Sequence, residues 1–218
     1  MKLSKLLERS EYTLVQGTED TEISTLVYDS RKVEENSVFV CISGAAFDGH
    51  KFIGQVIEKG AKVIVVQQDV EAPKGVTVIR FDDTRKALAE MSAAYFGYPA
   101  EELTTIGITG TKGKTTITYM IQSVLEHAGQ KTGLIGTIET VIGDERIPSV
   151  NTTPESYVIQ ESFRKMADAG CKNVVMEVSS QGLMLHRVSG FTFDYGIFTN
   201  LAEDHIGENE HKDMDDYI

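Results

Sequence analysis

The segment that most constrains the fold is GITGTKGKTTI, residues 107–117, which continues the apolar run that starts at Leu103. A buried strand that enters a glycine-containing turn and then a helix can direct backbone N–H groups and the helix dipole at a phosphate. The usual phosphate loop, G-x-x-x-x-G-K-[ST], has glycine at the position of Ile108. Gly110 and Gly113 still allow the turn. We therefore predict a strand, a phosphate loop and a helix within an α/β fold.

Hydrogen-bond donors surround this turn. Lys114 can reach terminal phosphate oxygens, and the Thr115 hydroxyl can ligate Mg²⁺. The competing interpretation is a strand-to-helix turn that uses glycine for geometry and lysine for solubility. The full string T-G-x-x-G-K-T-T after a strand favours ATP and Mg²⁺ binding instead. The expected nucleotide-binding residues are Gly110, Thr111, Lys112, Gly113, Lys114, Thr115 and Thr116.

Helices and strands alternate on both sides of the loop, which predicts α/β architecture with a mainly parallel sheet and right-handed crossovers. Asp82 or Asp83 is expected to cap the helix that follows it, and Pro154 to lie in the first turn of another helix. The linker composition of residues 97–103 predicts two domains, 1–98 and 99–218. Strands are expected at 25–31, 37–44, 61–68, 75–81, 103–110, 171–180 and 191–200, one or two strands forming a hairpin at 131–143, and helices at 50–61, 82–96, 115–129 and 154–170.

Charge and composition exclude several classes of function. The chain has 21 Lys plus Arg against 33 Asp plus Glu, a net charge of −12, which disfavours nucleic acids and anionic membranes as partners. No apolar run reaches the roughly 20 residues of a membrane span, and the N-terminus is too charged for a secretory signal. Cys41 and Cys171 are expected to be buried free thiols. We expect a cytoplasmic protein that does not insert into membranes.

Polar residues follow three of the expected strands. They are Asn151-Thr152-Thr153-Pro154, then Glu177 with Ser179-Ser180-Gln181, and then Asn200, Asp204 and His205. Each group has a simple alternative, namely a helix cap, a salt bridge and a surface loop. Because ligands bind beyond the carboxyl ends of parallel strands, we expect the groups to share a crevice with the loop. Thr115 and Glu177 would hold one Mg²⁺, and a neutral His205 a second divalent cation, in a phosphoryl-transfer site.

These motifs together resemble the Mur ligases of peptidoglycan synthesis. The resemblance rests on TGTKGKTT, NTTP, MEVSSQGL and NLAEDHI in the second half, and on YDSR, SVFVCISG and FDGH in the first. It covers essentially the whole chain. It implies a small N-terminal α/β domain, residues 1–98, that binds a UDP-sugar, and a central P-loop ATPase domain, residues 99–218, that is incomplete here. A C-terminal domain for the incoming amino acid would follow in the family.

The resemblance also implies an activity, and it is strongest to the members that add the third residue of the stem peptide. ATP would phosphorylate the D-glutamate carboxylate of UDP-N-acetylmuramoyl-L-Ala-D-Glu, and a diamino acid, L-lysine or meso-diaminopimelate, would attack the acyl phosphate. Such an enzyme serves cell wall biogenesis, cell shape and cell division. By similarity the catalytic residues are Lys114, Glu177 and His205, the metal ligands are Thr115, Glu177 and His205, and the substrate-binding residues are Tyr28, Ser30, Ala45, Ala46, Phe47, Asn151, Thr152, Thr153, Ser179 and Arg187.

The chain departs from the family pattern at Gln181, Leu185 and Glu203, which affects fine substrate contacts rather than the ATP site. The family's carbamylated lysine falls beyond Ile218, so we expect the N-terminal part of a longer ligase that makes no tripeptide product by itself. Two alternatives stay open: the sister ligase that adds the terminal dipeptide, over which the MEVSS string favours the tripeptide enzyme, and a binding module without chemistry. The Asp-Ser-Arg and Asp-Gly-His segments argue against a third, folylpolyglutamate synthase, which lacks this N-terminal domain. The choice of diamino acid and the oligomeric state stay open too.

Overall fold

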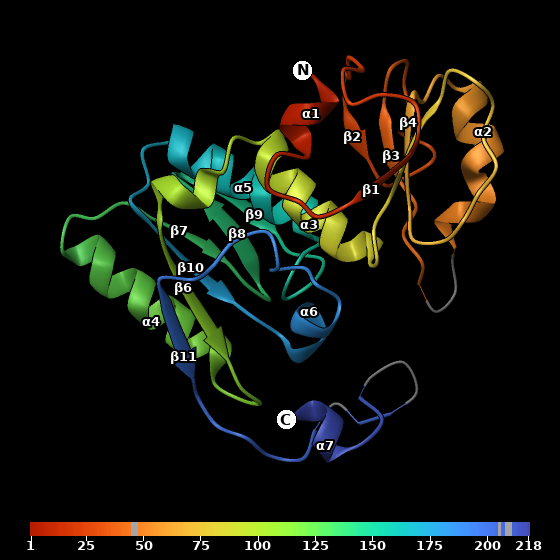
Figure 1. The fold of residues 1–218 in the computed structure, drawn as a ribbon. Coiled ribbons are helices and arrows are strands. Elements are labelled where there is room, and N and C mark those ends of the chain that lie inside the picture. The colour runs from red at the N-terminus through yellow and green to blue at the C-terminus, as the bar shows by residue number, and fades with distance from the viewer. Residues whose placement is uncertain (45–47, 205, 208–210) are drawn as a thin grey trace. The chain divides into compact units, whose positions relative to one another are not determined.

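The computed structural model describes residues 1–44, 48–204, 206–207 and 211–218 (Figure 1). Four residues named above, Ala45, Ala46, Phe47 and His205, therefore lie outside the described residues. The chain forms two compact units, Met1–Tyr95 and Phe96–Ile218. No helix in the described ranges is long and apolar enough to cross a membrane.

The first unit is built around a five-stranded sheet of order β1-β5-β4-β3-β2. All neighbours are parallel except β1, which runs antiparallel to β5. Its strands are β1 Thr13–Gln16, β2 Leu26–Val27, β3 Val38–Val40, β4 Val63–Val66 and β5 Thr77–Arg80. Its helices are α1 Leu3–Leu6, η1 Gly49–Phe52 (a 3₁₀ turn), α2 Ile53–Glu58 and α3 Thr84–Tyr95.

Two interior strands of this sheet, β3 and β4, are apolar throughout, because helices cover both faces. Every residue of β3 and β4 is buried, and Phe39 and Ile64 pack with Val56 of α2 on one face. Helix α3 contacts the same two strands. Asp83, and not Asp82, caps α3, since its Oδ1 accepts the N–H groups of Arg85 at 2.7 Å and of Lys86 at 3.0 Å. The helix expected over 50–61 is split into η1 and α2.

The second unit contains a six-stranded sheet of order β11-β6-β10-β7-β8-β9. The first four strands are parallel, and β8 and β9 extend the sheet as an antiparallel hairpin. The strands are β6 Thr104–Thr109, β7 Thr132–Ile135, β8 Glu139–Ile142, β9 Glu145–Pro148, β10 Asn173–Glu177 and β11 Tyr195–Phe198. The helices are η2 Pro99–Glu102, α4 Lys114–His127, α5 Ser156–Asp168, α6 Ser180–Met184 and α7 Met214–Tyr217. The expected α/β class with a mainly parallel sheet is confirmed.

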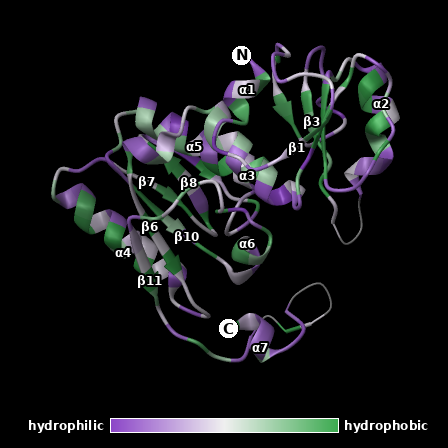
Figure 2. Cartoon of the chain, in the orientation of Figure 1, coloured by the Kyte–Doolittle hydropathy of each residue, from purple (hydrophilic) through white to green (hydrophobic). Residues whose placement is uncertain are grey.

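Helices α4 and α5 cover opposite faces of this sheet (Figure 1). On α5, Ile159, Phe163 and Met166 follow the spacing of one helix face, are fully buried and pack against β10. On α4 the partly buried Ile117 and Ile121 pack against β6. The apolar colouring of the strands in Figure 2 matches this two-sided burial. This packing on both faces holds β6 and β10 in place, and the phosphate loop follows directly after β6.

One expected helix begins later than the sequence predicts. Helix α5 starts at Ser156 with Glu155 as its N-cap, so Pro154 precedes the helix instead of occupying its first turn. Two bonds hold the preceding backbone in a bend. The Thr153 hydroxyl donates to the Glu177 carbonyl at 3.1 Å, and the Thr153 carbonyl accepts from Arg187 Nη1 at 2.9 Å. The bend is tied to β10 and cannot join the helix.

Candidate nucleotide and substrate sites

The phosphate loop joins β6 to α4, as expected. Gly110 has φ +121° and Gly113, the N-cap of α4, has φ +88°, two conformations that L side chains rarely adopt. Gly110 also lies against the chain after β11, where a Cβ would come within 2.3 Å of Thr199 Oγ1 and 2.8 Å of the Asn200 carbonyl oxygen. Around Gly113 the space is open. Gly110 therefore serves both turn geometry and close packing, while Gly113 serves geometry alone.

Lys114 folds back over the loop. Its Nζ donates to the Gly110 carbonyl at 2.7 Å and to the Thr111 carbonyl at 3.1 Å. The Thr118 hydroxyl, one turn further along α4, donates to the Lys114 carbonyl at 2.8 Å. The ammonium group is thus held at the mouth of the turn, next to the N-terminus of a 14-residue helix whose dipole favours anions. Lys112 and Thr116 are exposed beside it.

Asn200, which follows β11, holds the loop from the other side. Its carbonyl accepts the Thr111 N–H at 2.9 Å, and its Oδ1 accepts the Lys112 N–H at 3.0 Å. Its Nδ2 donates back to the Lys112 carbonyl at 2.9 Å, and the Thr199 hydroxyl donates to the same carbonyl at 2.8 Å. Asn200 was expected near the loop because it ends a neighbouring strand. In the structure its hydrogen bonds hold the loop backbone at Thr111 and Lys112.

Glu177 ends β10 beside the loop, and its side chain is fully buried. The Thr115 hydroxyl donates to its Oε2 at 2.8 Å. Thr137, in the turn after β7, donates its N–H to Oε1 at 2.9 Å and its hydroxyl to Oε2 at 3.1 Å. A buried carboxylate is costly without such donors, and these three bonds compensate for its desolvation. Thr115 and Glu177 are therefore brought together as the sequence predicts, and Thr137 is an unexpected third member.

The donor set at this point fits Mg²⁺. The Thr115 hydroxyl donates its proton to Glu177, so the lone pairs of the Thr115 oxygen remain available to a cation. Both residues offer the hard oxygen atoms that Mg²⁺ prefers. Within the described part of the chain no three His, Cys, Asp or Glu side chains gather as a metal site. A small protein donor set is what Mg²⁺ takes when water and nucleotide phosphates complete its shell. The second cation was assigned to His205, which is outside the described residues.

Four of the residues expected to hold the muramoyl-peptide are linked to Glu177 through hydrogen bonds. Thr153 accepts the Ser179 N–H at 2.9 Å, and Ser179 caps α6 by accepting the Gly182 N–H at 3.0 Å. Thr152 shares a 3.0 Å hydrogen bond with the Thr137 hydroxyl. Arg187 reaches the Thr153 carbonyl, and Asn151 is exposed. Thr153 and Ser179 thus support the backbone, while Asn151 and Thr152 are accessible to a ligand.

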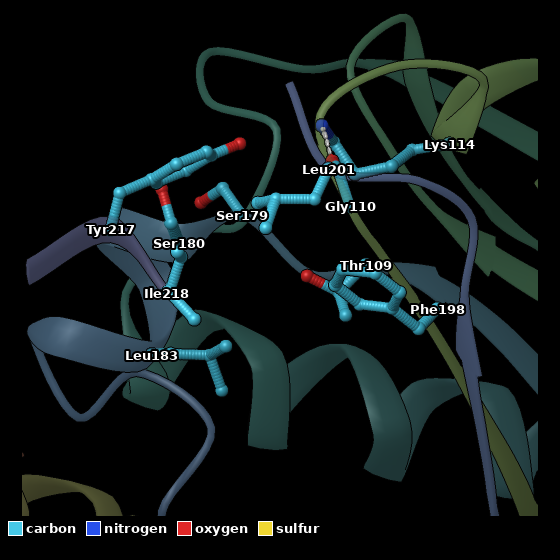
Figure 3. A pocket seen from close by; sticks show the side chains of 10 residues that line it. All are labelled: Thr109, Gly110, Lys114, Ser179, Ser180, Leu183, Phe198, Leu201, Tyr217 and Ile218. Atoms are coloured by element: carbon cyan, nitrogen blue, oxygen red, sulfur yellow. Dashed lines mark hydrogen bonds between the residues drawn. The ribbon is translucent and has the colours of Figure 1, made fainter. Parts of the chain in front are cut away.

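A cavity of about 240 Å³ lies between the phosphate loop and α6 (Figure 3). Lys114 and Gly110 line one side of it, with their hydrogen bond drawn in the figure, and Ser179 lies opposite. Tyr217 of α7 also lines the cavity, and its hydroxyl shares a 2.9 Å hydrogen bond with Thr111. The cavity thus places the expected phosphate-binding lysine and an expected substrate-binding serine around one space.

The first unit has a cavity of its own, about 550 Å³ in volume, which Tyr28 and Ser30 line together with Phe52 and Gln55. Asp29 and Arg31 lie at the same cavity. Hydrogen bonds from Arg31 lower the pKa of Asp29 to about 2, so this carboxylate stays ionised. The two described residues of the expected UDP-binding set are therefore adjacent, on a cavity with aromatic and polar walls.

His50 anchors the chain just after residues 45–47. Its Nε2 accepts the Gln67 N–H at 3.2 Å, which places the ring proton on Nδ1, 2.8 Å from Asp48 Oδ1. The bonds from His50 lower the pKa of Asp48. Gln67 Oε1 in turn accepts from the Thr84 hydroxyl at 2.7 Å. This chain of bonds attaches Asp48 and His50 to the residue that follows β4 and to the start of α3.

Comparison with known proteins agrees with these observations. Residues 108–218 match the family model described as Mur ligase middle domain, and residues 22–96 match the model described as Mur ligase family, catalytic domain. The UDP-N-acetylmuramoyl-L-alanyl-D-glutamate–2,6-diaminopimelate ligase of Clostridium perfringens is 50% identical over all of this chain, and that of Clostridium tetani is 47% identical. The chain spans only 44% and 45% of the lengths of these two relatives.

Solved structures share the fold. A structure of a protein with the same ligase name superposes with a TM-score of 0.81 at 22% identity, covering all of this chain and 43% of the other. The MurF ligase from Thermotoga maritima in complex with ADP gives 0.53 at 22% identity, with coverages of 83% and 38%. At these identities the likeness concerns the fold alone. Since the middle-domain model covers half of the sequence, including the loop, Glu177 and Asn200, the chain belongs to the Mur ligase family.

Proposed function

We propose that this chain binds ATP and UDP-N-acetylmuramoyl-L-Ala-D-Glu for an ATP-dependent ligase reaction that joins 2,6-diaminopimelate to the D-glutamate. The observation that carries the proposal is the Thr115–Glu177 hydrogen bond of 2.8 Å beside Lys114, which assembles a phosphate loop and a buried carboxylate at one sheet edge. The choice of UDP-N-acetylmuramoyl-L-Ala-D-Glu as the substrate comes from the names of the relatives that are 50% and 47% identical. The same names favour diaminopimelate over lysine.

In this proposal the loop N–H groups and the Lys114 ammonium bind the phosphates of ATP. Thr115 and Glu177 would hold Mg²⁺, which would supply positive charge for the phosphates. A D-glutamate carboxylate oxygen bonds to the γ-phosphorus as the bond to the ADP oxygen breaks. The diamino acid nitrogen then attacks the acyl carbon, inorganic phosphate leaves, and the amine loses a proton. Because both partners of the first step are anionic, the positive charge of Lys114 is needed where they meet.

The first unit would bind the UDP part. Support comes from the cavity beside Tyr28 and Ser30, in which an aromatic ring can contact the uracil and a hydroxyl can bind a polar edge or a phosphate. The muramoyl-peptide would lie near Asn151 and Thr152, and the Arg187 guanidinium, which lies 3.6 Å from the Glu155 carboxylate, would bind its carboxylates. Reactions that consume ATP and UDP-sugars place the protein in the cytoplasm, and the product serves peptidoglycan synthesis.

Lys114→Ala tests this function in the 218-residue chain. Calorimetric titration with a non-hydrolysable ATP analogue and Mg²⁺ should show binding weakened by about 10- to 100-fold, because the charged hydrogen bonds of the ammonium are lost. UDP-N-acetylmuramoyl-L-Ala-D-Glu should bind with nearly unchanged affinity. Lys165→Ala is the matched control, since Lys165 lies on α5 and pairs with Glu161 at 2.9 Å. Unchanged nucleotide affinity in Lys114→Ala would refute the assignment of the loop.

The ligase that adds the terminal dipeptide is the second candidate, because two solved MurF ligases share the fold with TM-scores of 0.56 and 0.53. Its substrate already carries the third residue. Titration of the chain with UDP-muramoyl-dipeptide and UDP-muramoyl-tripeptide separates the two candidates. Tighter binding of the tripeptide form would reverse our choice, and binding of neither ligand would remove both.

A further inference from the structure

The turn after β7, Gly136-Thr137, lies against the carboxylate of Glu177. A Cβ at Gly136 would come within 2.4 Å of Glu177 Oε1, so a side chain at this position would displace the carboxylate from where it lies. Thr137 binds both carboxylate oxygens, through its N–H to Oε1 and its hydroxyl to Oε2. On its other side the same hydroxyl meets Thr152 Oγ1 at 3.0 Å. Thr137 therefore stands between the expected metal-binding carboxylate and an expected substrate-binding residue.

The direction of these hydrogen bonds follows from the number of protons. A carboxylate only accepts, so the single hydroxyl proton of Thr137 goes to Glu177. The bond between Thr137 and Thr152 then needs the Thr152 proton, which makes Thr152 the donor. The three groups form a directed chain from Thr152 through Thr137 to Glu177. Hydrogen bonds in such a chain strengthen one another.

The turn itself is held in place by neighbouring strands. Gly136 donates its N–H to the Glu139 carbonyl at 3.1 Å. The Glu139 carboxylate accepts from the Tyr119 hydroxyl of α4 at 2.9 Å and also from Arg146 of β9. Thr137, although exposed, is thus attached to a fixed backbone rather than to a free loop. Its hydroxyl keeps one position relative to Glu177.

We propose that Thr137 is a positioning residue that couples binding of the muramoyl-peptide at Thr152 to binding of Mg²⁺ and nucleotide at Glu177. The inference rests on the proposed function. An anionic group of the peptide that accepts the Thr152 proton takes this donor away from Thr137. The Thr137 hydroxyl then donates less strongly, and Glu177 keeps more negative charge for the cation. Each ligand should therefore tighten the binding of the other by the same factor.

Thr137→Val tests the coupling, because valine keeps the branched shape and the backbone N–H but lacks the hydroxyl. The dissociation constant of UDP-N-acetylmuramoyl-L-Ala-D-Glu is measured in the 218-residue chain with and without Mg²⁺ and the ATP analogue, at several Mg²⁺ concentrations. In the unmodified chain we expect the nucleotide to tighten substrate binding at least about fivefold. In Thr137→Val this factor should fall to about one, and the apparent Mg²⁺ affinity measured without substrate should not fall, because Glu177 has lost a hydrogen-bond donor that draws on its negative charge.

Three further variants serve as a rescue, a control and a second test of the coupling. Thr137→Ser should restore the coupling, and Thr104→Val, at the opposite end of β6, should leave it unchanged. Thr152→Val removes the other end of the chain of bonds and should abolish the coupling even if Thr137→Val fails to fold. Full coupling in a folded Thr137→Val or Thr152→Val variant, or none in the unmodified chain, would overturn the inference. Failure of the unmodified chain to bind either ligand would instead contradict the proposed function.

Discussion

Gly110→Ala should destabilise the second unit by an amount that the structure allows us to divide. At φ +121° an alanine is strained by about 1–3 kcal/mol. Its Cβ would also lie 2.3 Å from Thr199 Oγ1 and 2.8 Å from the Asn200 carbonyl oxygen. Forced overlap of this kind costs about 1–3 kcal/mol more, because the Asn200 backbone is bonded to the loop and cannot move freely. The expected loss is about 2–6 kcal/mol.

Gly113→Ala is the matched control. It has the same backbone preference, with φ +88°, but its nearest neighbour is Ile117 Cδ1 at 3.9 Å. Only the left-handed conformation is penalised there, by about 1–2 kcal/mol. The difference between the two variants measures the close contact between the phosphate loop and the chain after β11.

Urea unfolding followed by circular dichroism measures the loss, since the chain has no Trp to report by fluorescence. Native-state hydrogen exchange assigns the loss to the second unit, where the amides of Thr111 and Thr199 should lose protection first. The first unit should keep its exchange rates. If Gly110→Ala were no less stable than Gly113→Ala, the close packing of Gly110 against Asn200 would be refuted.

Two side chains give predictions of a different kind. Burial raises the pKa of the Cys41 thiol to about 12. In the native chain at pH 8 we therefore expect iodoacetamide not to modify Cys41, and peptide mapping should find the label only after unfolding. Labelling of the native thiol at the rate of a free cysteine would contradict its burial. Burial and the bond to Glu139 raise the pKa of Tyr119 to about 12, above its unfolded value near 10. The stability that the protonated Tyr119 hydroxyl contributes is complete below pH 10 and is lost as the pH rises through 12. In urea titrations the free energy of unfolding of Tyr119→Phe should therefore change less between pH 10 and 12 than that of the unmodified chain. An identical pH dependence in the two chains would exclude the effect.

Much of the fold could be predicted, because its elements follow simple periodicities. Apolar runs identify β4, β6 and β10, and the spacing of Ile159, Phe163 and Met166 identifies α5. Strands β1 and β9 were missed because each is four residues long and largely exposed, with no buried face to leave a pattern. Helix α6 leaves no clear pattern in the sequence, because it is only five residues long, too short to show a helical periodicity.

The site could be predicted only in part. Glu177 is recognisable because a carboxylate that directly follows a buried apolar run needs donors, and the parallel sheet places it beside the loop. Thr137 left no comparable pattern, since it is one of many threonines, and its role depends on the close approach that Gly136 permits. Tyr217 lies 106 residues from its partner Thr111, and no local pattern encodes a contact at that separation.

The strand order has a consequence for how this unit is made. Strand β10 pairs with both β6 and β7, so it is inserted between two strands that precede it in the chain. Thr115 and Glu177 are 62 residues apart, and Lys112 and Asn200 are 88 apart. A ribosome therefore releases the loop well before the residues that shape it, and these long-range pairings form late. On the proposed function, ATP would bind only after β10 and β11 are in place, and it would then selectively stabilise newly made chains whose sheet is fully paired.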